Sequence, residues 1–596
     1  MTYNARFTLL SLDHQRAKHA DTMGLDLDNV RNRLSNIDAV PLLSLLGILA
    51  GMASGLMILL FRQFIEVPLT LGFRGGAEDF ESLSPLWRVC LPLGGALLLA
   101  LMLFRLPKYL QRSGVAYVIE RFNLHQGTIS ARSLMVQFFG AAISLMSGHS
   151  MGREGPAVHI GAASSSLIGQ WAGLPNNSLR ILVGCGVAAA ISASFNTPLA
   201  GVIFAMEVVM LEYSIATFTP IILASVVGTI LTRAVYGHEA AFELPAAVSI
   251  DSLYEIPFLL LTGLVIGCLA ATFVITTGKL QQIGNDRHIF IRFLTAGLIM
   301  GLLGLLVPEV MGIGYDTVDK AVAGQIGFTS LLVICGVKLL ASSICAASGF
   351  PAGIIGPCMV IGATAGGAFG FLVAKALPGA DPALYVIIGM GAMMAATMQA
   401  PLAALIALLE LTANHNIIFP GMLVVVIASL VSSQVFRQKS IFQMALEQQG
   451  IELKSTALGR HLSRAAVPAV MDRNFRRHEP KLPYEEALKI IEQQPSWILI
   501  EEDGAPVKLL HAVDLVNFIQ SKENKEKIPE VIDLLHMPAS RLDVVPVLMS
   551  ATLKEALDEM DKHSADAVYV RRMNAPNIYR VFGVVTRQDI ERFYKV

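Results

Sequence analysis

One short motif occurs twice in this chain and constrains its fold more than any other feature. Residues 152–156 read Gly-Arg-Glu-Gly-Pro, and residues 353–357 read Gly-Ile-Ile-Gly-Pro. A Ser-Gly pair precedes both motifs and Ile-Gly-Ala follows both, while Pro-Leu-Ala and a later glutamate recur further along, at 198–207 and 401–410. An ordered series of matches of this kind indicates two related halves, about 40–236 and 256–448, each with its own broken helices.

Composition places these halves in a membrane. The chain has 596 residues, of which 54% are hydrophobic and only 15% charged, and its mean hydropathy is +0.58. These values fit a polytopic membrane protein with a soluble appendage. The net charge of −1 gives no basic footprint for nucleic acid.

Charge in the loops gives the two halves opposite orientations. The spans predicted at 40–61 and 87–104 are long enough to cross the hydrocarbon core, and so is the one at 256–277. Basic residues at 105–112 and 279–292 mark inside loops, whereas the acidic loop at 237–255 is outside. Two inverted halves with matching broken helices predict a substrate site near the midplane, where helix N-termini meet.

Glu154 is the candidate functional residue at this midplane. It lies in an otherwise small and apolar stretch, and a carboxylate at membrane depth is costly unless it serves a function. Pro156 suits a first helical turn, which places Glu154 just before a helix N-terminus, and helix N-termini bind anions. The chain's own carboxylate would occupy this anion site until an anion displaces it or a proton neutralises it.

Two alternatives remain open for this region. Glu154 could be a structural partner of Arg153 rather than a gate. His149 and His159 lie close to Glu154 in the sequence and could relay protons, although satisfied polar contacts are the commoner role of such groups.

The soluble part, residues 449–596, contains two similar units at about 466–522 and 537–596. Each reads as a helix, a strand, and a strand that leads into a second helix. The order resembles a pair of CBS domains, a family in which a Gly-x-x-Thr-x-x-Asp ending contacts the phosphate and ribose of an adenine nucleotide. Thr586 and Asp589 match that ending, whereas the stretch 511–514 keeps only the aspartate. The resemblance implies ATP, ADP or AMP as a ligand; the alternative is a scaffold for dimerisation without a ligand.

The motifs at 152–156 and 354–357, together with Phe-Asn-x-Pro-Leu-Ala-Gly at 195–201, resemble the CLC family of chloride channels and proton/chloride exchangers. The resemblance covers roughly residues 40–450. It implies an all-α inverted-repeat membrane fold with about eighteen helices per subunit, a homodimer with one pore in each subunit, and a soluble α/β CBS pair. The transported ions would be chloride and, in an exchanger, protons, with no required cofactor. Loop charges then place residues 1–39 and the CBS pair in the cytoplasm of a cell whose plasma (bacterial inner) membrane holds the protein.

Site residues carry over from this resemblance by position. Glu154 matches the gating glutamate, and Ser113 matches a serine that donates to the central anion. Around them the resemblance implies an anion-binding set formed by Ser113, Gly152, Arg153, Gly155, Gly353, Ile354, Ile355, Gly356 and Phe442. Arg112 adds a charge near the inner mouth of the pore.

Two positions depart from the exchangers of the family. Val208 stands where exchangers carry a second glutamate that receives protons from the inside, and valine cannot carry a proton. Phe442 stands where a tyrosine hydroxyl would donate to the anion, and phenylalanine has no such donor. We therefore expect channel-like or poorly coupled chloride flux of the voltage-gated type. The alternative is a proton-coupled antiporter whose inner pathway uses water or Glu207.

Other classes fit less well. An intramembrane metalloprotease needs a His-Glu-x-x-His helix, but His238-Glu239 is followed by no second histidine at the required spacing. A CBS-regulated divalent cation transporter predicts paired membrane carboxylates, whereas Glu154, Glu207 and Glu410 are isolated. The six cysteines lack metal or redox spacing. The sequence therefore predicts neither an enzyme nor a metal site.

Overall fold

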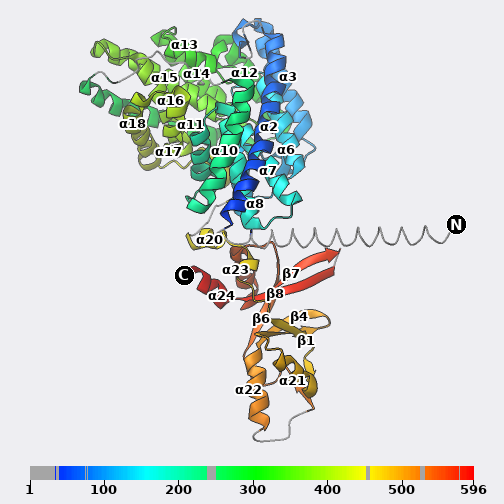
Figure 1. Ribbon diagram of the computed structural model, residues 1–596. Coiled ribbons are helices and arrows are strands. Elements are labelled where there is room, and N and C mark those ends of the chain that lie inside the picture. The colour runs from blue at the N-terminus through cyan, green and yellow to red at the C-terminus, as the bar shows by residue number, and fades with distance from the viewer. Residues whose placement is uncertain are drawn as a thin grey trace, which may run out of the picture. The chain divides into compact units, whose positions relative to one another are not determined.

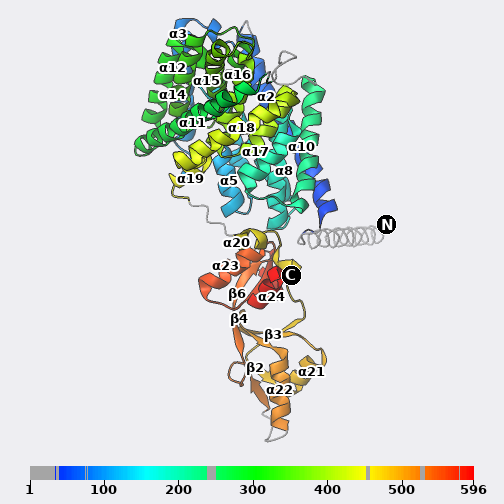
Figure 2. The same cartoon turned by 90° about the vertical axis from the view of Figure 1, so that its left-hand side faces the viewer.

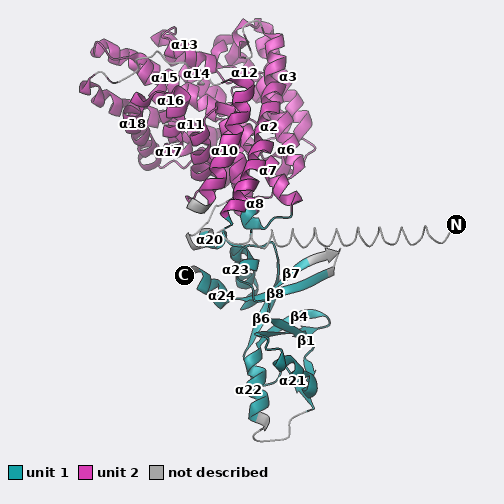
Figure 3. Cartoon of the chain, in the orientation of Figure 1, with its two compact units in different colours: residues 1–39, 173–178, 454–596 teal, residues 40–172, 179–453 magenta. Residues whose placement is uncertain are grey.

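The computed structural model describes residues 34, 39–73, 76, 78–237, 250, 252–451, 457–523, 530–575 and 578–595. The chain forms two compact units (Figures 1 and 3). Unit 2 comprises residues 40–172 and 179–453, and unit 1 comprises residues 1–39, 173–178 and 454–596. The predicted cytoplasmic segment 1–39 falls outside the described residues except for positions 34 and 39.

The first half of unit 2 is built from apolar helices of very different lengths. They are α2 (Val40–Gly72), α3 (Pro85–Leu103), α4 (Lys108–Gln111), α5 (Gly114–Leu124), α6 (Ala131–Met146), α7 (Glu154–Trp171), α8 (Asn176–Phe195), α9 (Pro198–Phe204) and α10 (Ile215–Tyr236). The predicted first span ends at residue 61, but α2 continues to Gly72. Arg62 and Glu66 end the apolar run, yet they form an ion pair one turn apart (3.2 Å) that suits a continuing helix.

The second half repeats this variety of lengths. Its helices are α11 (Ile256–Asn285), α12 (Ile289–Leu306), α13 (Tyr315–Val322), α14 (Phe328–Ala347), α15 (Ile355–Ala376), α16 (Pro382–Met398), α17 (Pro401–Thr412), α18 (Ile418–Leu430) and α19 (Ile441–Glu447). From α2 to α19 the described residues form eighteen α-helices, which agrees with the number that the resemblance implies.

Only half of these helices can cross a membrane unaided. Among the described residues, nine are long and apolar enough to span it, and four further apolar helices are too short. Figure 2 shows the short α17 lying among longer helices of the unit. Broken helices at membrane depth need protein or a cavity around them, because lipid cannot satisfy their free backbone groups. The predicted mixture of full and broken spans is confirmed.

Two glutamates cap each other's half of the repeat. The Glu410 carboxylate accepts the N–H groups of Leu199 (2.9 Å) and Ala200 (2.8 Å) at the start of α9. In the same way, the Glu207 carboxylate accepts the N–H groups of Leu402 (3.2 Å) and Ala403 (2.6 Å) at the start of α17. The two repeated glutamates therefore play the same part in both halves: each caps a helix of the other half, at an N-terminus that favours negative charge.

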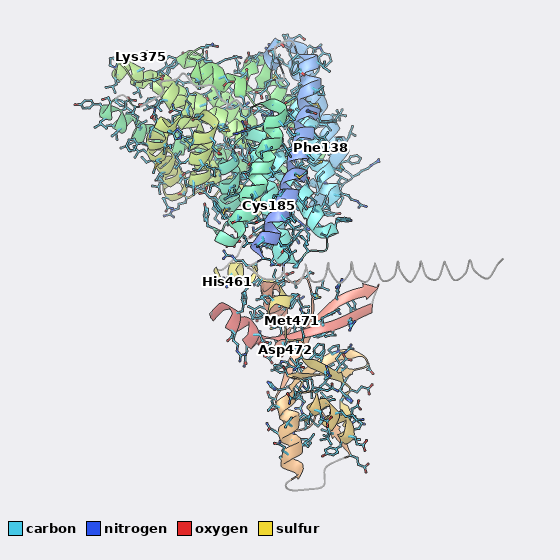
Figure 4. The ribbon with its side chains drawn as sticks, viewed as in Figure 1. Phe138, Cys185, Lys375, His461, Met471 and Asp472 are labelled. Carbon is cyan, nitrogen blue, oxygen red and sulfur yellow. The ribbon has the colours of Figure 1, made fainter. Side chains whose placement is uncertain are left out.

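Aromatic and small residues fill the core of unit 2. Phe138 of α6, which is labelled in Figure 4, packs against Phe61 and Phe64 of α2, with ring centroids 5.3 Å and 5.4 Å apart. Elsewhere glycines let helices touch through their backbones. A side chain at Gly366 of α15 would lie 2.0 Å from the Tyr385 carbonyl oxygen of α16. Close backbone approach of this kind is a common way to pack helices in membranes.

Unit 1 is an α/β structure. Its elements are α20 (Ala457–Leu462), β1 (Phe475–His478), β2 (Lys481–Pro483), α21 (Tyr484–Glu492), β3 (Trp497–Glu502), β4 (Ala505–His511), α22 (Ala512–Glu523), β5 (Val531–Asp533), β6 (Arg541–Leu548), α23 (Leu553–His563), β7 (Ala567–Ala575), β8 (Ile578–Thr586) and α24 (Arg587–Lys595). Six strands form one sheet in the order β1-β3-β4-β6-β7-β8, and β2 pairs with β5. The predicted order of helices and strands holds in both modules, as expected for a CBS pair.

Hydrogen bonds join the modules within unit 1. Strand β4 of the first module pairs with β6 of the second, with Leu509 opposite Leu542. Asp472, which precedes the first module's sheet, exchanges backbone hydrogen bonds with Val584 of β8 (2.9 Å and 3.0 Å). Figure 4 labels Asp472 beside the sheet. The modules therefore share one continuous scaffold.

Candidate functional site

The two halves of unit 2 meet at a pair of glycines. The Gly152 N–H donates to the Gly353 carbonyl (2.6 Å), and the Gly353 N–H donates to the Gly152 carbonyl (2.7 Å). A side chain on Gly353 would lie 2.6 Å from the Gly155 nitrogen, so the approach requires glycine. The repeated motifs are therefore adjacent in space, and they bring the N-termini of α7 and α15 together as predicted.

Glu154 is the first residue of α7, and its side chain is fully buried. One carboxylate oxygen, Oε2, lies 3.3 Å from the Gly356 N–H in the first turn of α15. The other, Oε1, accepts a short hydrogen bond from the Tyr315 hydroxyl of α13. The carboxylate thus occupies a place where hydrogen-bond donors and a helix N-terminus favour negative charge, and both donors come from the opposite half.

Arg153 is not the main partner of Glu154. Its Nη1 pairs with Glu66 of α2 at 2.7 Å, whereas its Nε lies 4.0 Å from the Glu154 carboxylate. Glu66 also accepts from the Tyr236 hydroxyl (3.1 Å). The structural interpretation of Glu154 as a partner of Arg153 is therefore weaker than the interpretation of Glu154 as an occupant of an anion site.

A cavity of about 720 Å³ lies within unit 2 beside this junction. It brings together six of the predicted anion-site residues: Ser113, Gly155, Gly353, Ile354, Ile355 and Phe442. The other three, Gly152, Arg153 and Gly356, do not line it. Among the described residues of the lining, the charged ones are Lys108, Arg112, Arg287 and Arg292, and none is a carboxylate. Such a lining favours anions over cations.

Two predicted residues, Ser113 and Phe442, line the cavity from different elements. Ser113 precedes α5, and its hydroxyl does not cap that helix. Phe442 is buried in the first turn of α19, where Ser440 caps the helix by accepting the Phe442 N–H (3.3 Å). Phe442 therefore lines the cavity from a capped helix, and its side chain has no hydroxyl to donate.

Gln137 holds the backbone around this cavity, and sequence reasoning missed it. Its side-chain oxygen, Oε1, accepts the Gly114 N–H (2.8 Å), and its side-chain nitrogen, Nε2, donates to the Pro351 carbonyl (2.7 Å). The side chain is buried in α6 and so ties the residue after Ser113 to the loop before Gly353. The only sequence signal is an amide inside an apolar helix. Arg112 is likewise less free than expected, because it pairs with Glu120 at 2.6 Å.

Val208, the residue predicted to replace the inner proton acceptor of exchangers, lies beside Glu207. Val208 is buried in a π-helical turn, Ala205–Met210. The adjacent Glu207 points to the start of α17, where its two oxygens receive backbone N–H groups. A carboxylate held in this way is a helix cap.

The two histidines near Glu154 make contacts elsewhere. His159 lies 3.0 Å from the Ser133 hydroxyl and stacks on Tyr117, with ring centroids 4.7 Å apart. His149 contacts the Ser147 hydroxyl and the Pro92 carbonyl at 3.0 Å and 3.1 Å. Within the part of the chain that the structure describes, neither ring hydrogen-bonds Glu154, so the relay interpretation gains no support.

The predicted nucleotide residues of unit 1 contact each other. The Thr586 hydroxyl donates to Asp589 Oδ2 (2.6 Å), and that oxygen also accepts the Thr586 N–H (2.9 Å). The pair lies at the start of α24. As for metals, the described residues contain no cluster of three or more histidine, cysteine or acidic side chains, and the His238-Glu239 motif lies outside them.

The fold is that of a membrane protein with inverted repeats, and a buried carboxylate lies where the two halves meet. Comparison with known proteins names the class more closely. Residues 94–433 match the family model "Voltage gated chloride channel", which is more than half of the chain. The chain therefore belongs to this family, the CLC family. Its members are chloride channels or transporters and not enzymes, as predicted.

Two curated relatives are similar over most of their own length. A "Putative chloride channel protein ClcB-like" from Ralstonia nicotianae is 30% identical over 416 residues, which cover 67% of this chain and 95% of the relative. An "H(+)/Cl(-) exchange transporter ClcA" from Vibrio vulnificus is 28% identical over 431 residues, which cover 69% and 90%.

Two solved structures share the fold. A slow cyanobacterial Cl−/H+ antiporter matches with a TM-score of 0.62 and 24% identity over 68% of this chain and 97% of its own. A eukaryotic CLC transporter matches with a TM-score of 0.56 and 17% identity over 94% of this chain and 98% of its own. The second match extends well beyond the membrane unit and agrees with a C-terminal α/β region.

Proposed function

We propose that this protein conducts chloride passively, or with poor proton coupling, through a pore that Glu154 gates. The observation that carries the proposal is the position of the Glu154 carboxylate. It is fully buried, it lies at the N-terminus of α15, and it accepts hydrogen bonds from donors that an anion could otherwise use. Protonation or displacement of this carboxylate would free the donors for chloride.

Two departures support weak coupling. Val208 leaves the inner side of the pathway without a proton acceptor, and the neighbouring Glu207 is held as a helix cap. Phe442 removes one hydroxyl donor, and a hydrogen bond to a charged group contributes about 1.5–3 kcal/mol. This loss corresponds to about 10- to 150-fold in anion affinity. Tight exchange needs each ion's movement to depend on the other, and both requirements are weakened here.

The competing function is proton-coupled exchange by an unusual inner route. The relatives favour it, since the Vibrio protein is named an exchanger and the cyanobacterial structure is an antiporter. Water in the cavity of about 720 Å³ would be the proton carrier in that case, because Glu207 is engaged.

Chloride efflux separates the two functions. Proteoliposomes loaded with potassium chloride are diluted into low chloride, and valinomycin is added so that potassium balances the charge. We expect efflux to run to completion with valinomycin alone, because no proton needs to move. Efflux that stops early and resumes only after a proton carrier is added would instead identify an exchanger.

We also place the protein in the plasma (bacterial inner) membrane as a homodimer, with the N-terminus and the CBS pair in the cytoplasm. The basic loops at 105–112 and 279–292 support this orientation. The resemblance of the motifs supports the dimer. Crosslinking in native membranes and protease protection of right-side-out vesicles test the two assignments separately.

Adenine nucleotide is the proposed regulator at the CBS pair. Thr586 and Asp589 hydrogen-bond each other, and a bound nucleotide would exchange these contacts for contacts with its phosphate and ribose. We expect the full-length protein in detergent to bind ATP, ADP or AMP, and Thr586→Ala to weaken binding at least about tenfold through the lost hydroxyl. Calorimetry at millimolar nucleotide is the measurement.

A matched control lies in the same module. Thr552 caps α23 by a similar reciprocal arrangement with Glu555, so Thr552→Ala removes an equivalent cap at a position outside the CBS nucleotide motif. Equal loss of binding in both variants would assign the effect to folding. Absence of heat with all three nucleotides would exclude the proposed regulator.

A further inference from the structure

Tyr315 touches the gating carboxylate, and neither the repeat nor the resemblance points to it. It is the first residue of α13, which follows the Gly-Ile-Gly turn at 312–314. Its hydroxyl donates to Glu154 Oε1, while Gly356 provides the N–H at Oε2. The two donors therefore hold the two oxygens of one carboxylate. Tyr315 is half-buried, whereas Glu154 is fully buried.

The position of Tyr315 is fixed by its own contacts. The Tyr315 N–H donates to Glu78 Oε2 at 2.8 Å, which caps the start of α13. Its ring lies 5.8 Å from the Arg153 guanidinium and 6.4 Å from the ring of Phe195. The backbone hydrogen bond and these two neighbours of the ring restrict where the hydroxyl can lie. This is the geometry of a preorganised donor and not of an incidental surface contact.

We infer that Tyr315 is a positioning residue that holds ionised Glu154 in the blocking position. The inference rests on the proposed gating role of Glu154 and adds the group that sets how readily the gate opens. A hydroxyl that donates to a carboxylate stabilises its ionised form over its protonated form. Loss of the hydroxyl must therefore make release of the carboxylate easier and require less acid.

Other charged groups around this pair set the background for any pH dependence. Arg153 lies nearest, with Nε at 4.0 Å from Glu154, and Glu66 neutralises part of its charge. Glu78 lies at the backbone of Tyr315, and the buried Lys338 of α14 donates to the carbonyls of residues 310 and 312. Asp316 follows Tyr315 and pairs with Lys320 at 2.9 Å. Tyr315→Phe alters none of these groups, so a shift in pH response would belong to the hydroxyl.

The test is chloride flux from proteoliposomes across an acidic to neutral pH series for wild type, Tyr315→Phe, Glu154→Gln and the double variant. Tyr315→Phe is expected to move the pH of half-maximal flux upward by about one unit. The reason is that loss of a hydrogen bond to a charged group changes an equilibrium constant, here that for protonation of the gate, by about tenfold or more. In the Glu154→Gln background, removal of the hydroxyl should leave the pH response unchanged, and flux in the double variant shows that the protein is folded.

Tyr385→Phe is the matched control. This buried tyrosine of α16 donates to Glu255 at 3.3 Å, so it is a second tyrosine–carboxylate pair in the same unit, on other elements. It should leave the pH midpoint unchanged. An unshifted midpoint in Tyr315→Phe, or a change of maximal flux alone, would overturn the positioning role. A wild-type pH response in Glu154→Gln would instead overturn the gate itself, so the two failures are distinct.

Discussion

Replacement of Glu154 by glutamine is expected to remove the pH dependence of chloride flux while flux itself persists. Glutamine has nearly the shape of a protonated glutamate but carries no charge, so it competes with chloride for the donors at Tyr315 and Gly356 more weakly than the carboxylate does, and it does so equally at every pH. Flux at neutral pH should then rise to the level that wild type reaches in acid. The measurement is initial chloride efflux from proteoliposomes at a series of pH values.

Glu255→Gln is the matched control for this variant. Glu255 is also a buried carboxylate of unit 2, and it accepts from a tyrosine hydroxyl, that of Tyr385. Its replacement should leave the pH profile unchanged. A Glu154→Gln protein that kept the wild-type profile, or that lost anion flux at every pH, would contradict a gate that competes with the anion.

A methyl group at Gly353 is expected to reduce chloride flux strongly. The added carbon would lie 2.6 Å from the Gly155 nitrogen and 2.9 Å from the Gly152 carbonyl oxygen, both of them backbone atoms that cannot rotate away. The glycine pair must therefore separate, and with it the N-termini of α7 and α15. Overpacking of this kind costs about 1–3 kcal/mol. If this cost weakens anion binding, the anion affinity falls by about 5- to 150-fold.

Gly336→Ala tests whether this effect is specific to the site. Gly336 lies in the middle of α14, and a side chain there would meet no atom within 4 Å. This variant should elute from a sizing column and conduct chloride as wild type does. Equal flux in Gly353→Ala and wild type would mean that close contact of the two halves is not needed for transport.

The sequence predicted those parts of the fold that depend on local signals. In the motif at 152–156, Pro156 is a local signal for the start of a helix. The matching motif at 353–357 contacts it in space, as expected for two repeated halves. In unit 1 the helix expected at 484–492 is observed over the same residues, since its apolar period and flanking strands are local. Repeats and periodicity are properties that a single sequence displays.

The contacts that complete the site could not be predicted in this way. The chain from Glu154 to Tyr315 spans 161 residues, and Gln137 reaches Pro351 over 214. The sequence positions of Tyr315, at the start of a short helix, and of Gln137, inside an apolar helix, do not indicate which residues they contact. Arg153 illustrates the same limit, because proximity in sequence pairs it with Glu154, whereas the fold gives it Glu66 of α2.

Proton movement driven by a chloride gradient tests the central claim most directly. Proteoliposomes receive a chloride gradient without a pH gradient, and chloride and external pH are recorded together. With Val208 in place of a proton acceptor and Glu207 engaged as a cap, we predict chloride flux without sustained uphill movement of protons. Sustained uphill proton pumping by the wild type, abolished in Glu154→Gln, would contradict passive flux and identify a coupled exchanger.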